Sequence, residues 1–247
     1  MTRADIFLVE NGYARSRAEA QAAIRAGKVS AEGKPVLKSA QPIPDGAAIV
    51  YEKPHPYVSR GGVKLDAAIK HFSPMLGGWF TRDAVCLDIG ASTGGFTHAL
   101  SKHGAAKVYA VDVGHGQMHP DLAASRLVVL LEGKDARNLT DADIPEQLDG
   151  IVADVSFISL KLVLAPTLRF VRSGGWLIAL VKPQFEVGRE GVGKGGIVKD
   201  EVAQAKAVQG IADWLATQSG WSVIGTMESP ITGGDGNREF LLAAKKS

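Results

Sequence analysis

Three predicted strands after residue 100 each end in a charged side chain. Their apolar runs lead directly into Asp112, Asp154 and Lys182. Because the carboxyl ends of strands in an open α/β sheet line a common crevice, we expect these three side chains to converge there. A lysine that a carboxylate orients can align a hydroxyl group and manage its proton while an already activated group is transferred.

A glycine-rich turn precedes these strand ends. Residues 85–100 predict a strand, a turn and a helix, the first unit of a Rossmann-like sheet. Gly90, Gly94 and Gly95 let a ligand approach the backbone in front of the helix, although such a turn also occurs as a purely structural feature. Their spacing does not match the dinucleotide fingerprint, and no Gly-Lys-Ser/Thr follows as in a P-loop.

Asp112 adds a second feature of a cofactor site. It ends the next predicted strand, 24 positions after Asp88, where Rossmann-like folds place a carboxylate on a ribose diol. An acid at this position without a phosphate-binding turn favours a nucleoside cofactor that lacks phosphates. The residues therefore indicate S-adenosyl-L-methionine.

The composition is that of a globular protein with uneven charge. The 247 residues are enough for one large domain or for two of unequal size. Residues 1–60 carry nine Lys/Arg against six Asp/Glu, and the remainder carries nineteen against twenty, which is consistent with a polyanionic partner of the N-terminal part. The single cysteine, Cys86, excludes a disulfide within the chain. Without a signal peptide or a membrane-spanning apolar run, the sequence indicates a soluble cytoplasmic protein.

Residues 1–52 predict a compact pair of short helices followed by a hairpin. Ser16 and Glu19 form a capping box that opens the second helix, and Gly27 ends it. Several basic side chains could share one face, which either binds nucleic acid or is merely solvated. Residues 53–60 predict a semi-rigid linker because they contain two prolines, and a longer domain occupies residues 61–247.

The N-terminal segment resembles the S4 RNA-binding domain. The matching stretches are Arg3-Ala-Asp-Ile-Phe-Leu-Val, Ala14-Arg-Ser-Arg and Ala20-Gln-Ala-Ala-Ile-Arg-Ala-Gly-Lys-Val. The resemblance implies that the second helix and the hairpin face structured RNA, although residues 30–33 depart from the usual Val-Asn-Gly turn. The RNA-binding residues expected on this basis, including one from the linker, are Arg3, Arg15, Arg17, Arg25, Lys28 and Arg60.

Five motifs spread over nearly the whole chain resemble those of the TlyA (haemolysin-A-like) family of ribosomal RNA 2′-O-methyltransferases, in which an S4 domain precedes an FtsJ-like methyltransferase domain. They are Ser59-Arg-Gly-Gly-Val-Lys-Leu, Asp88-Ile-Gly-Ala-Ser-Thr-Gly-Gly-Phe-Thr, Asp154-Val-Ser-Phe-Ile-Ser, Lys182-Pro-Gln-Phe-Glu and Asn237-Arg-Glu-Phe. The resemblance implies an α/β fold, with a Rossmann-like S-adenosylmethionine-dependent methyltransferase domain after a small α+β S4-like domain.

The same resemblance implies the site residues. Those that match the Lys-Asp-Lys-Glu set of FtsJ-like enzymes are Lys64, Asp154, Lys182 and Glu239. We expect Lys182 to lie between the carboxylates of Asp154 and Glu239, which favour its charged form. There it would orient the hydroxyl and stabilise the developing alkoxide, with late acceptance of the proton as the alternative, while Lys64 would add positive charge near the ribose or phosphate. The cofactor residues are Gly90, Ser92, Gly94, Gly95, Phe96, Asp112 and Asp135, of which Asp135 is expected to bond the adenine amino group. No metal site is indicated.

The remaining expectations concern the later elements and the function. We expect a buried strand at 127–131, an amphipathic helix at 160–171, a turn at glycines 174–175 before the strand that leads to Lys182, and a glycine-rich loop at 184–196. A helix that Asp200 caps and that runs to about 218 should follow, and then strands at 221–227 and 238–244. The favoured function is methylation of a ribose 2′-hydroxyl, at a cytidine, in ribosomal RNA or a ribosomal subunit. The early start of the S4-like helix favours the large-subunit RNA. The alternatives are a catalytically silent ribosome-assembly factor, a small-molecule methyltransferase and a membrane-lytic haemolysin. No protein partner is indicated.

Overall fold

The computed structural model describes residues 1–247, except the side chain of Arg189, and divides into two compact units, Met1–Pro56 and Tyr57–Ser247. The four residues 57–60, which the sequence assigns to a linker, therefore belong to the larger unit. One contact that holds them there is the hydrogen bond that the Val58 backbone N–H donates to His98 Nδ1, at 3.1 Å.

The smaller unit is a helix pair with short strands. Its helices α1 (Ala4–Glu10) and α2 (Arg17–Arg25) share a core with the strands, built around Phe7, Leu8 and Ile24. The strands are β1 (Thr2–Arg3), β2 (Val29–Ala31), β3 (Lys34–Pro35), β4 (Pro42–Ile43) and β5 (Ile49–Tyr51). Ser16 caps α2 by accepting from the Glu19 N–H, but the Glu19 carboxylate bonds the Arg15 N–H and so closes the box one residue early.

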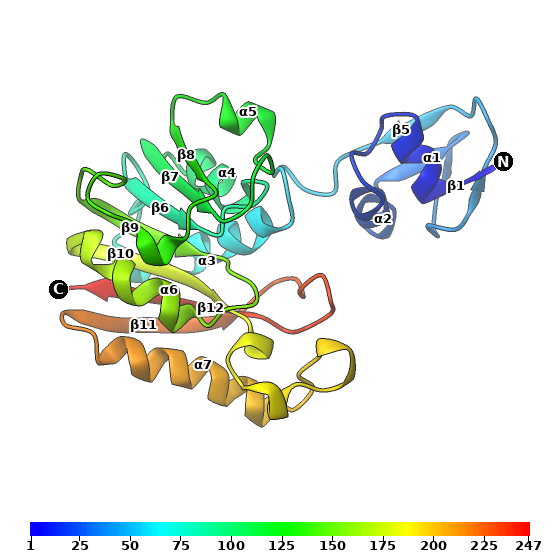
Figure 1. Ribbon diagram of the computed structural model, residues 1–247. Coiled ribbons are helices and arrows are strands. Elements are labelled where there is room, and N and C mark those ends of the chain that lie inside the picture. Colours follow the sequence, from blue (N-terminus) through cyan, green and yellow to red (C-terminus); the bar gives the residue numbers. More distant parts are fainter. The chain divides into compact units, whose positions relative to one another are not determined.

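The larger unit contains a seven-stranded sheet in the order β11-β12-β10-β9-β6-β7-β8. Strands β6 to β10 run parallel to one another, and β12 lies antiparallel between β10 and β11 (Figure 1). The strands are β6 (Val85–Ile89), β7 (Lys107–Asp112), β8 (Val128–Glu132), β9 (Leu148–Ala153), β10 (Val171–Val181), β11 (Trp221–Glu228) and β12 (Phe240–Lys246). The expected Rossmann-like α/β fold is confirmed.

Helices cover both faces of this sheet. Strand residues alternate between two cores, so that Leu87 and Ile89 of β6 pack toward α6 and α7, while Cys86 packs toward α3 and α4. The helices are α3 (Gly61–Leu76), α4 (Gly95–Lys102), α5 (Pro120–Ala123), α6 (Leu160–Thr167) and α7 (Glu201–Ala216). As expected, Asp200 caps α7, where its carboxylate accepts from the Val202 N–H.

Three expectations of the sequence need correction. Strand β8 is only partly buried along its length because it forms the edge of the sheet and has one neighbouring strand. Helix α6 ends at Thr167, one residue after Pro166, whose ring nitrogen cannot donate to the helix, and the 3-10 turn Leu168–Phe170 follows. The glycines at 174–175 lie inside β10, where the register with β9 shifts, rather than in a turn before it.

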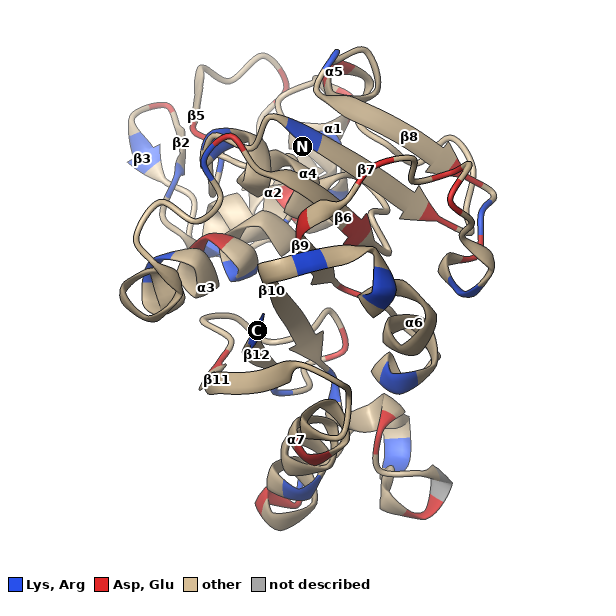
Figure 2. Ribbon diagram, turned by 90° about the vertical axis from the view of Figure 1, so that its left-hand side faces the viewer, with Lys and Arg blue, Asp and Glu red and all other residues tan. Residues whose placement is uncertain are grey.

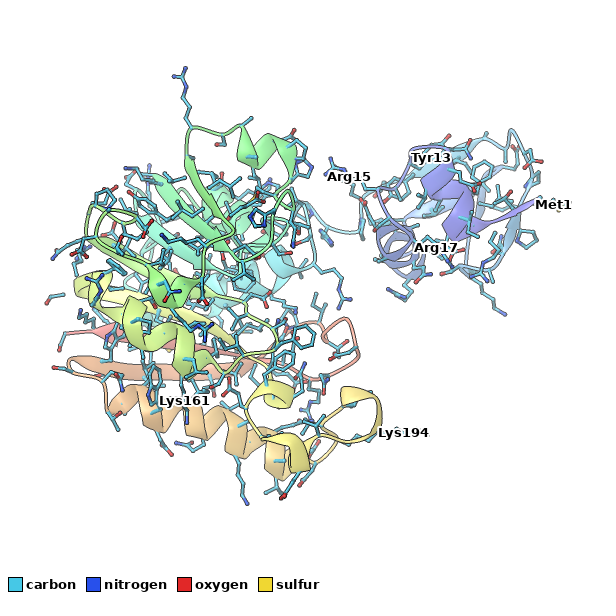
Figure 3. All side chains as sticks on the ribbon, in the orientation of Figure 1. Met1, Tyr13, Arg15, Arg17, Lys161 and Lys194 are labelled. Atoms are coloured by element: carbon cyan, nitrogen blue, oxygen red, sulfur yellow. The ribbon has the colours of Figure 1, made fainter. Side chains whose placement is uncertain are left out.

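The glycine-rich loop after β10 contains three 3-10 turns, Pro183–Phe185, Arg189–Gly191 and Lys194–Gly196. Asn237 anchors its far end: the side-chain carbonyl accepts from the Val198 N–H, and the amide donates to the Gly196 carbonyl, both at 2.9 Å. Figure 3 shows Lys194 at the outer tip of this loop. The loop is therefore tied to the segment that leads into β12.

Candidate active site

The glycine turn after β6 requires its glycines. Gly90 and Gly94 have φ values of 80° and 88°, a region that side chains other than glycine rarely adopt. A Cβ at Gly90 would lie 2.5 Å from the Asp154 carbonyl oxygen, and one at Gly95 would lie 2.3 Å from Ser59 Oγ. The turn therefore brings the start of α4 close to the end of β9 and to the segment before α3.

Asp112 fixes the turn from the neighbouring strand. Its carboxylate accepts from the Ser92 N–H at 2.8 Å and from the Gly114 N–H at 2.7 Å. Ser92, with a φ of 46°, also donates from its hydroxyl to Gln117 Oε1 at 3.2 Å. Figure 2 shows acidic segments near the ends of β6 and β7. Asp112 is thus at the carboxyl end of the parallel strands, where a ribose would be bound.

A cavity of about 480 Å³ extends from this turn along the ends of β7 and β9. Its wall combines the carboxylate of Asp112 with the apolar side chains of Val111, Ile158 and Val163. A polar group for a ribose diol beside apolar surface for a base suits an adenosyl group. The residues present therefore fit S-adenosyl-L-methionine.

Asp135 lines the same cavity but is engaged by Arg137. Its carboxylate accepts from the Arg137 N–H at 2.9 Å and from the guanidinium at distances down to 2.6 Å. These bonds hold the pKa of Asp135 below its usual value. The carboxylate that the family resemblance assigns to the adenine is thus ionised and oriented by Arg137.

The four residues of the expected catalytic set form two ion pairs instead of one cluster around Lys182. Lys182 Nζ lies 2.6 Å from Asp154 Oδ1 and donates to Ser156 Oγ at 2.9 Å. Glu239 does not bridge to Lys182: it pairs with Lys64. Because Lys64 lies in the first turn of α3, it reaches the segment before β12, and this placement corrects the expected arrangement.

The two ion pairs differ in accessibility. A second cavity, of about 240 Å³, is lined by Lys182 and Asp154 together with Ser59, Gly61 and Phe96. It shares Gly90, Ser92, Asp154 and Ser156 with the larger cavity, so the two adjoin. The side chains of Lys64 and Glu239, only 8 % and 3 % exposed, line neither of them. A substrate can therefore meet Lys182 and Asp154.

Asp88 is a buried acid beneath this site. It is fully buried in β6, and Thr97 Oγ1 donates to its Oδ2 at 2.6 Å. Burial raises the pKa of Asp88 to about 7, and the nearby carboxylates of Asp154 and Asp112 act in the same direction. Asp88 is therefore partly protonated at neutral pH and carries less negative charge than an ordinary aspartate.

Sequence reasoning missed an aromatic pair at the mouth of the site. Phe157, two positions after Val155, is 91 % exposed with a φ of 63°, an uncommon conformation for a bulky residue. Its ring centroid lies 5.1 Å from that of Phe185. The signal was present in the sequence, because each phenylalanine follows a strand-ending charged residue by three positions. An exposed phenylalanine that lines the larger cavity and packs on a half-buried one is typical of a binding surface.

The candidate RNA-binding residues of the smaller unit differ in their contacts. Asp5 is fully buried and accepts hydrogen bonds from Arg3, Arg17 and Gln21, and these bonds hold its pKa well below the usual range. Lys28 pairs with Glu52 at 2.5 Å. Arg15, Arg17 and Arg25 are exposed, and Figure 3 shows the first two as sticks. Arg60 belongs to the larger unit, where its guanidinium donates to the Thr232 carbonyl.

Comparison with known proteins assigns both units. Residues 57–246 match the FtsJ-like methyltransferase model, and residues 2–49 match the S4 domain. The chain is 43 % identical over 242 residues to the 16S/23S rRNA (cytidine-2′-O)-methyltransferase TlyA of Mycobacterium tuberculosis, covering 97 % of this chain and 88 % of that one. It is 36 % identical over 186 residues to the 23S rRNA (cytidine-2′-O)-methyltransferase TlyA of Campylobacter jejuni, covering 75 % and 69 %.

A solved structure of a protein from Streptococcus thermophilus that carries a hemolysin name matches with a TM-score of 0.75 and 36 % identity, covering 99 % of this chain and 88 % of that one. The glycine turn, the acid of β7 and the cavity between them agree with S-adenosyl-L-methionine as the cofactor of such a domain. The chain belongs to the TlyA (haemolysin-A-like) family and joins an S4 domain to an S-adenosylmethionine-dependent, FtsJ-like methyltransferase domain.

Proposed function

We propose that this chain methylates a ribose 2′-hydroxyl of ribosomal RNA, at a cytidine, with the large-subunit RNA as the substrate. The observation that carries the proposal is the Lys182–Asp154 ion pair in the smaller cavity, which adjoins the cavity that fits the cofactor. The Mycobacterium and Campylobacter relatives are both named as methyltransferases of a cytidine 2′-hydroxyl in 23S rRNA, which supports the choice of RNA.

The chemistry requires alignment and charge stabilisation more than bond activation. When bound, S-adenosyl-L-methionine supplies a methyl group on a cationic sulfur, so that a C–O bond forms as the C–S bond breaks and its electron pair stays on sulfur. The Lys182 ammonium donates to the 2′-oxygen, stabilises the negative charge that develops there and lets the hydroxyl proton leave to water. Asp154 holds that ammonium in place. Holding the two reactants in line contributes the rest of the acceleration.

The remaining residues bind and orient. Asp112 holds the ribose end of the cofactor and Asp135 its adenine end, while Gly90 and Gly95 allow its approach to the backbone. The exposed Phe157 offers an aromatic face on which a base of single-stranded RNA can stack. The basic side chains of the smaller unit contact the phosphates of the surrounding RNA.

We place the protein in the cytoplasm with the ribosomes, as this substrate requires. Among the residues that the structure describes, no helix combines the length and the apolar character that a bilayer crossing needs. The hemolysin name of the Streptococcus structure leaves membrane lysis as a function to test directly. A silent assembly factor and a small-molecule methyltransferase are the other outcomes to separate.

One assay distinguishes these functions. Purified protein is incubated with labelled S-adenosyl-L-methionine and either ribosomal subunit or its free RNA, and the 2′-O-methyl marks of both RNAs are mapped in cells with and without the gene. We expect one gene-dependent cytidine mark in the large-subunit RNA. RNA binding without methyl transfer would indicate a catalytically silent assembly factor. Transfer to small molecules alone would indicate a small-molecule methyltransferase, and dye release from anionic vesicles would indicate a lytic protein.

A further inference from the structure

The hydroxyl of Ser156 is the second partner of the Lys182 ammonium, a role that the sequence led us to expect for Glu239. Lys182 Nζ has two partners among the described residues: Asp154 at 2.6 Å and Ser156 Oγ at 2.9 Å. Both belong to the segment that follows β9, whereas Lys182 follows β10. From this geometry we propose that Ser156 is a positioning residue for methyl transfer, which rests on the proposed function and deepens it.

Ser156 is placed where the two reactants meet. It is one of the four residues that line both cavities, together with Gly90, Ser92 and Asp154. Ser156 is exposed, whereas the side chain of Lys182 is only 11 % exposed. A ligand that enters the smaller cavity can therefore contact the Ser156 hydroxyl as well as the ammonium behind the ion pair.

A second acceptor restricts the Lys182 ammonium. A lysine side chain has about 2 kcal/mol of rotamer entropy, so a contact with one carboxylate leaves its ammonium free to swing around that carboxylate. The ion pair with Asp154 and the hydrogen bond to Ser156 hold the ammonium from two sides and so restrict where its remaining N–H groups point. The 2′-oxygen of the substrate is the acceptor for one of these remaining N–H groups.

The choice of a serine also matters for charge. A hydroxyl oxygen accepts from the ammonium without a negative charge, whereas a second carboxylate would neutralise the field that stabilises the developing alkoxide. Ser156 thus gives the Lys182 ammonium a second acceptor without reducing the positive charge at the site.

The backbone holds Ser156 in this place. The Asp154 N–H donates to the Ile89 carbonyl at 2.9 Å, which fixes the start of the segment against β6. The following residue, Phe157, has a φ of 63°, and the chain bends at residues 156–158. The hydroxyl is therefore presented by a bend whose start is fixed against β6, and it already lies within hydrogen-bond distance of Lys182.

The test compares Ser156→Ala and Ser156→Thr with the wild type in single-turnover transfer of labelled methyl to ribosomal RNA. We expect the alanine variant to lose about 10-fold in rate, the effect of one hydrogen bond, with unchanged affinities for cofactor and RNA, and the threonine variant to recover most of the rate. Ser222→Ala, which removes the same atom from the exposed β11, is the matched control. A purely structural serine would change the unfolding midpoint, not the rate constant of the folded enzyme.

A double-mutant cycle shows whether Ser156 acts through Lys182. In a Lys182→Ala background, Ser156→Ala should lower the remaining rate less than about 3-fold, because the group that it positions is gone. Full additivity of the two losses would overturn the proposal, as would wild-type transfer by Ser156→Ala. Either result is distinct from a failure of the proposed function, in which the wild-type protein itself transfers no methyl group to RNA.

Discussion

Lys64 and Glu239, which lie 175 positions apart, form an ion pair in which both side chains are more than nine-tenths buried. The pair joins the first turn of α3 to the start of β12, so it fixes the helix that follows the domain boundary against the central sheet. It stabilises the domain that carries the second ion pair, Lys182 and Asp154, which lines a cavity.

Breaking this pair should destabilise the larger unit strongly. Lys64→Ala leaves a buried carboxylate without a partner and should lower the free energy of unfolding by about 3–5 kcal/mol. Lys64→Met combined with Glu239→Leu should lose less than either single change because both charges disappear. Urea unfolding followed by tryptophan fluorescence reports on this unit, since all four tryptophans lie in it. Asp141→Ala, which breaks an exposed pair with Arg169, should cost about 0–1 kcal/mol.

Asp112 should determine cofactor affinity. Asp112→Ala removes a carboxylate from the cavity wall and also frees the Ser92 N–H, and should weaken S-adenosyl-L-methionine binding by about 1–3 kcal/mol. Isothermal calorimetry on folded protein measures the change. Asp121→Ala removes an acid from exposed α5 and serves as the control. Wild-type affinity in the Asp112 variant would contradict the assignment of the cofactor site.

Lys182 should separate catalysis from binding. Lys182→Ala should keep its affinity for cofactor and RNA while methyl transfer falls by roughly 100-fold or more. Lys182→Arg should not restore the rate, because a planar guanidinium cannot occupy the ammonium site between Asp154 and Ser156. Single-turnover transfer of labelled methyl is the measurement. Near-normal transfer by either variant would remove Lys182 from the chemistry.

The smaller unit should supply salt-dependent RNA binding. If Arg15, Arg17 and Lys28 contact phosphates, replacing all three with alanine should weaken binding and reduce the slope of log affinity against log salt by up to about three contacts. The control replaces three exposed lysines of the larger unit, Lys102, Lys206 and Lys245. An unchanged slope in the first variant would mean that these side chains are only solvated.

Asp88 should make the stability of the larger unit depend on pH. Its folded pKa of about 7 lies above the ordinary value of 3.8, so between these values the unfolded chain binds fewer protons than the folded protein, and stability falls as pH rises. Asp88→Asn keeps an acceptor for Thr97 but does not titrate. The wild-type stability relative to this variant should therefore decrease by on the order of 4 kcal/mol from about pH 4 to about pH 8. Urea unfolding across this range measures it, and a constant difference would refute the prediction.

The fold could be predicted because its signals are local. A few neighbouring residues are enough to predict the glycine turn at 90–95, the strand β6 with its alternating side chains, and the start of α7 at Asp200. The half-buried character of β8 could not be predicted in this way, because an edge strand differs from a central one only in the number of its neighbours. Pro166 indicates the early end of α6, but the apolar periodicity continues past it, and for this reason the sequence predicted a helix as far as residue 171.

The sequence by itself determined which residue types reach the site. Asp112, Asp154 and Lys182 each follow or end a parallel strand, and the carboxyl ends of parallel strands lie at the same end of the sheet. Only the tertiary structure decided how the charges pair. Lys64 and Glu239 come from distant elements, so their contact depends on how α3 packs against β12, and that packing leaves Ser156 as the second partner of Lys182. The same applies to Asp5, whose burial turns Arg3 and Arg17 from free surface charges into oriented ones, because a buried carboxylate must find its donors in space and not along the chain.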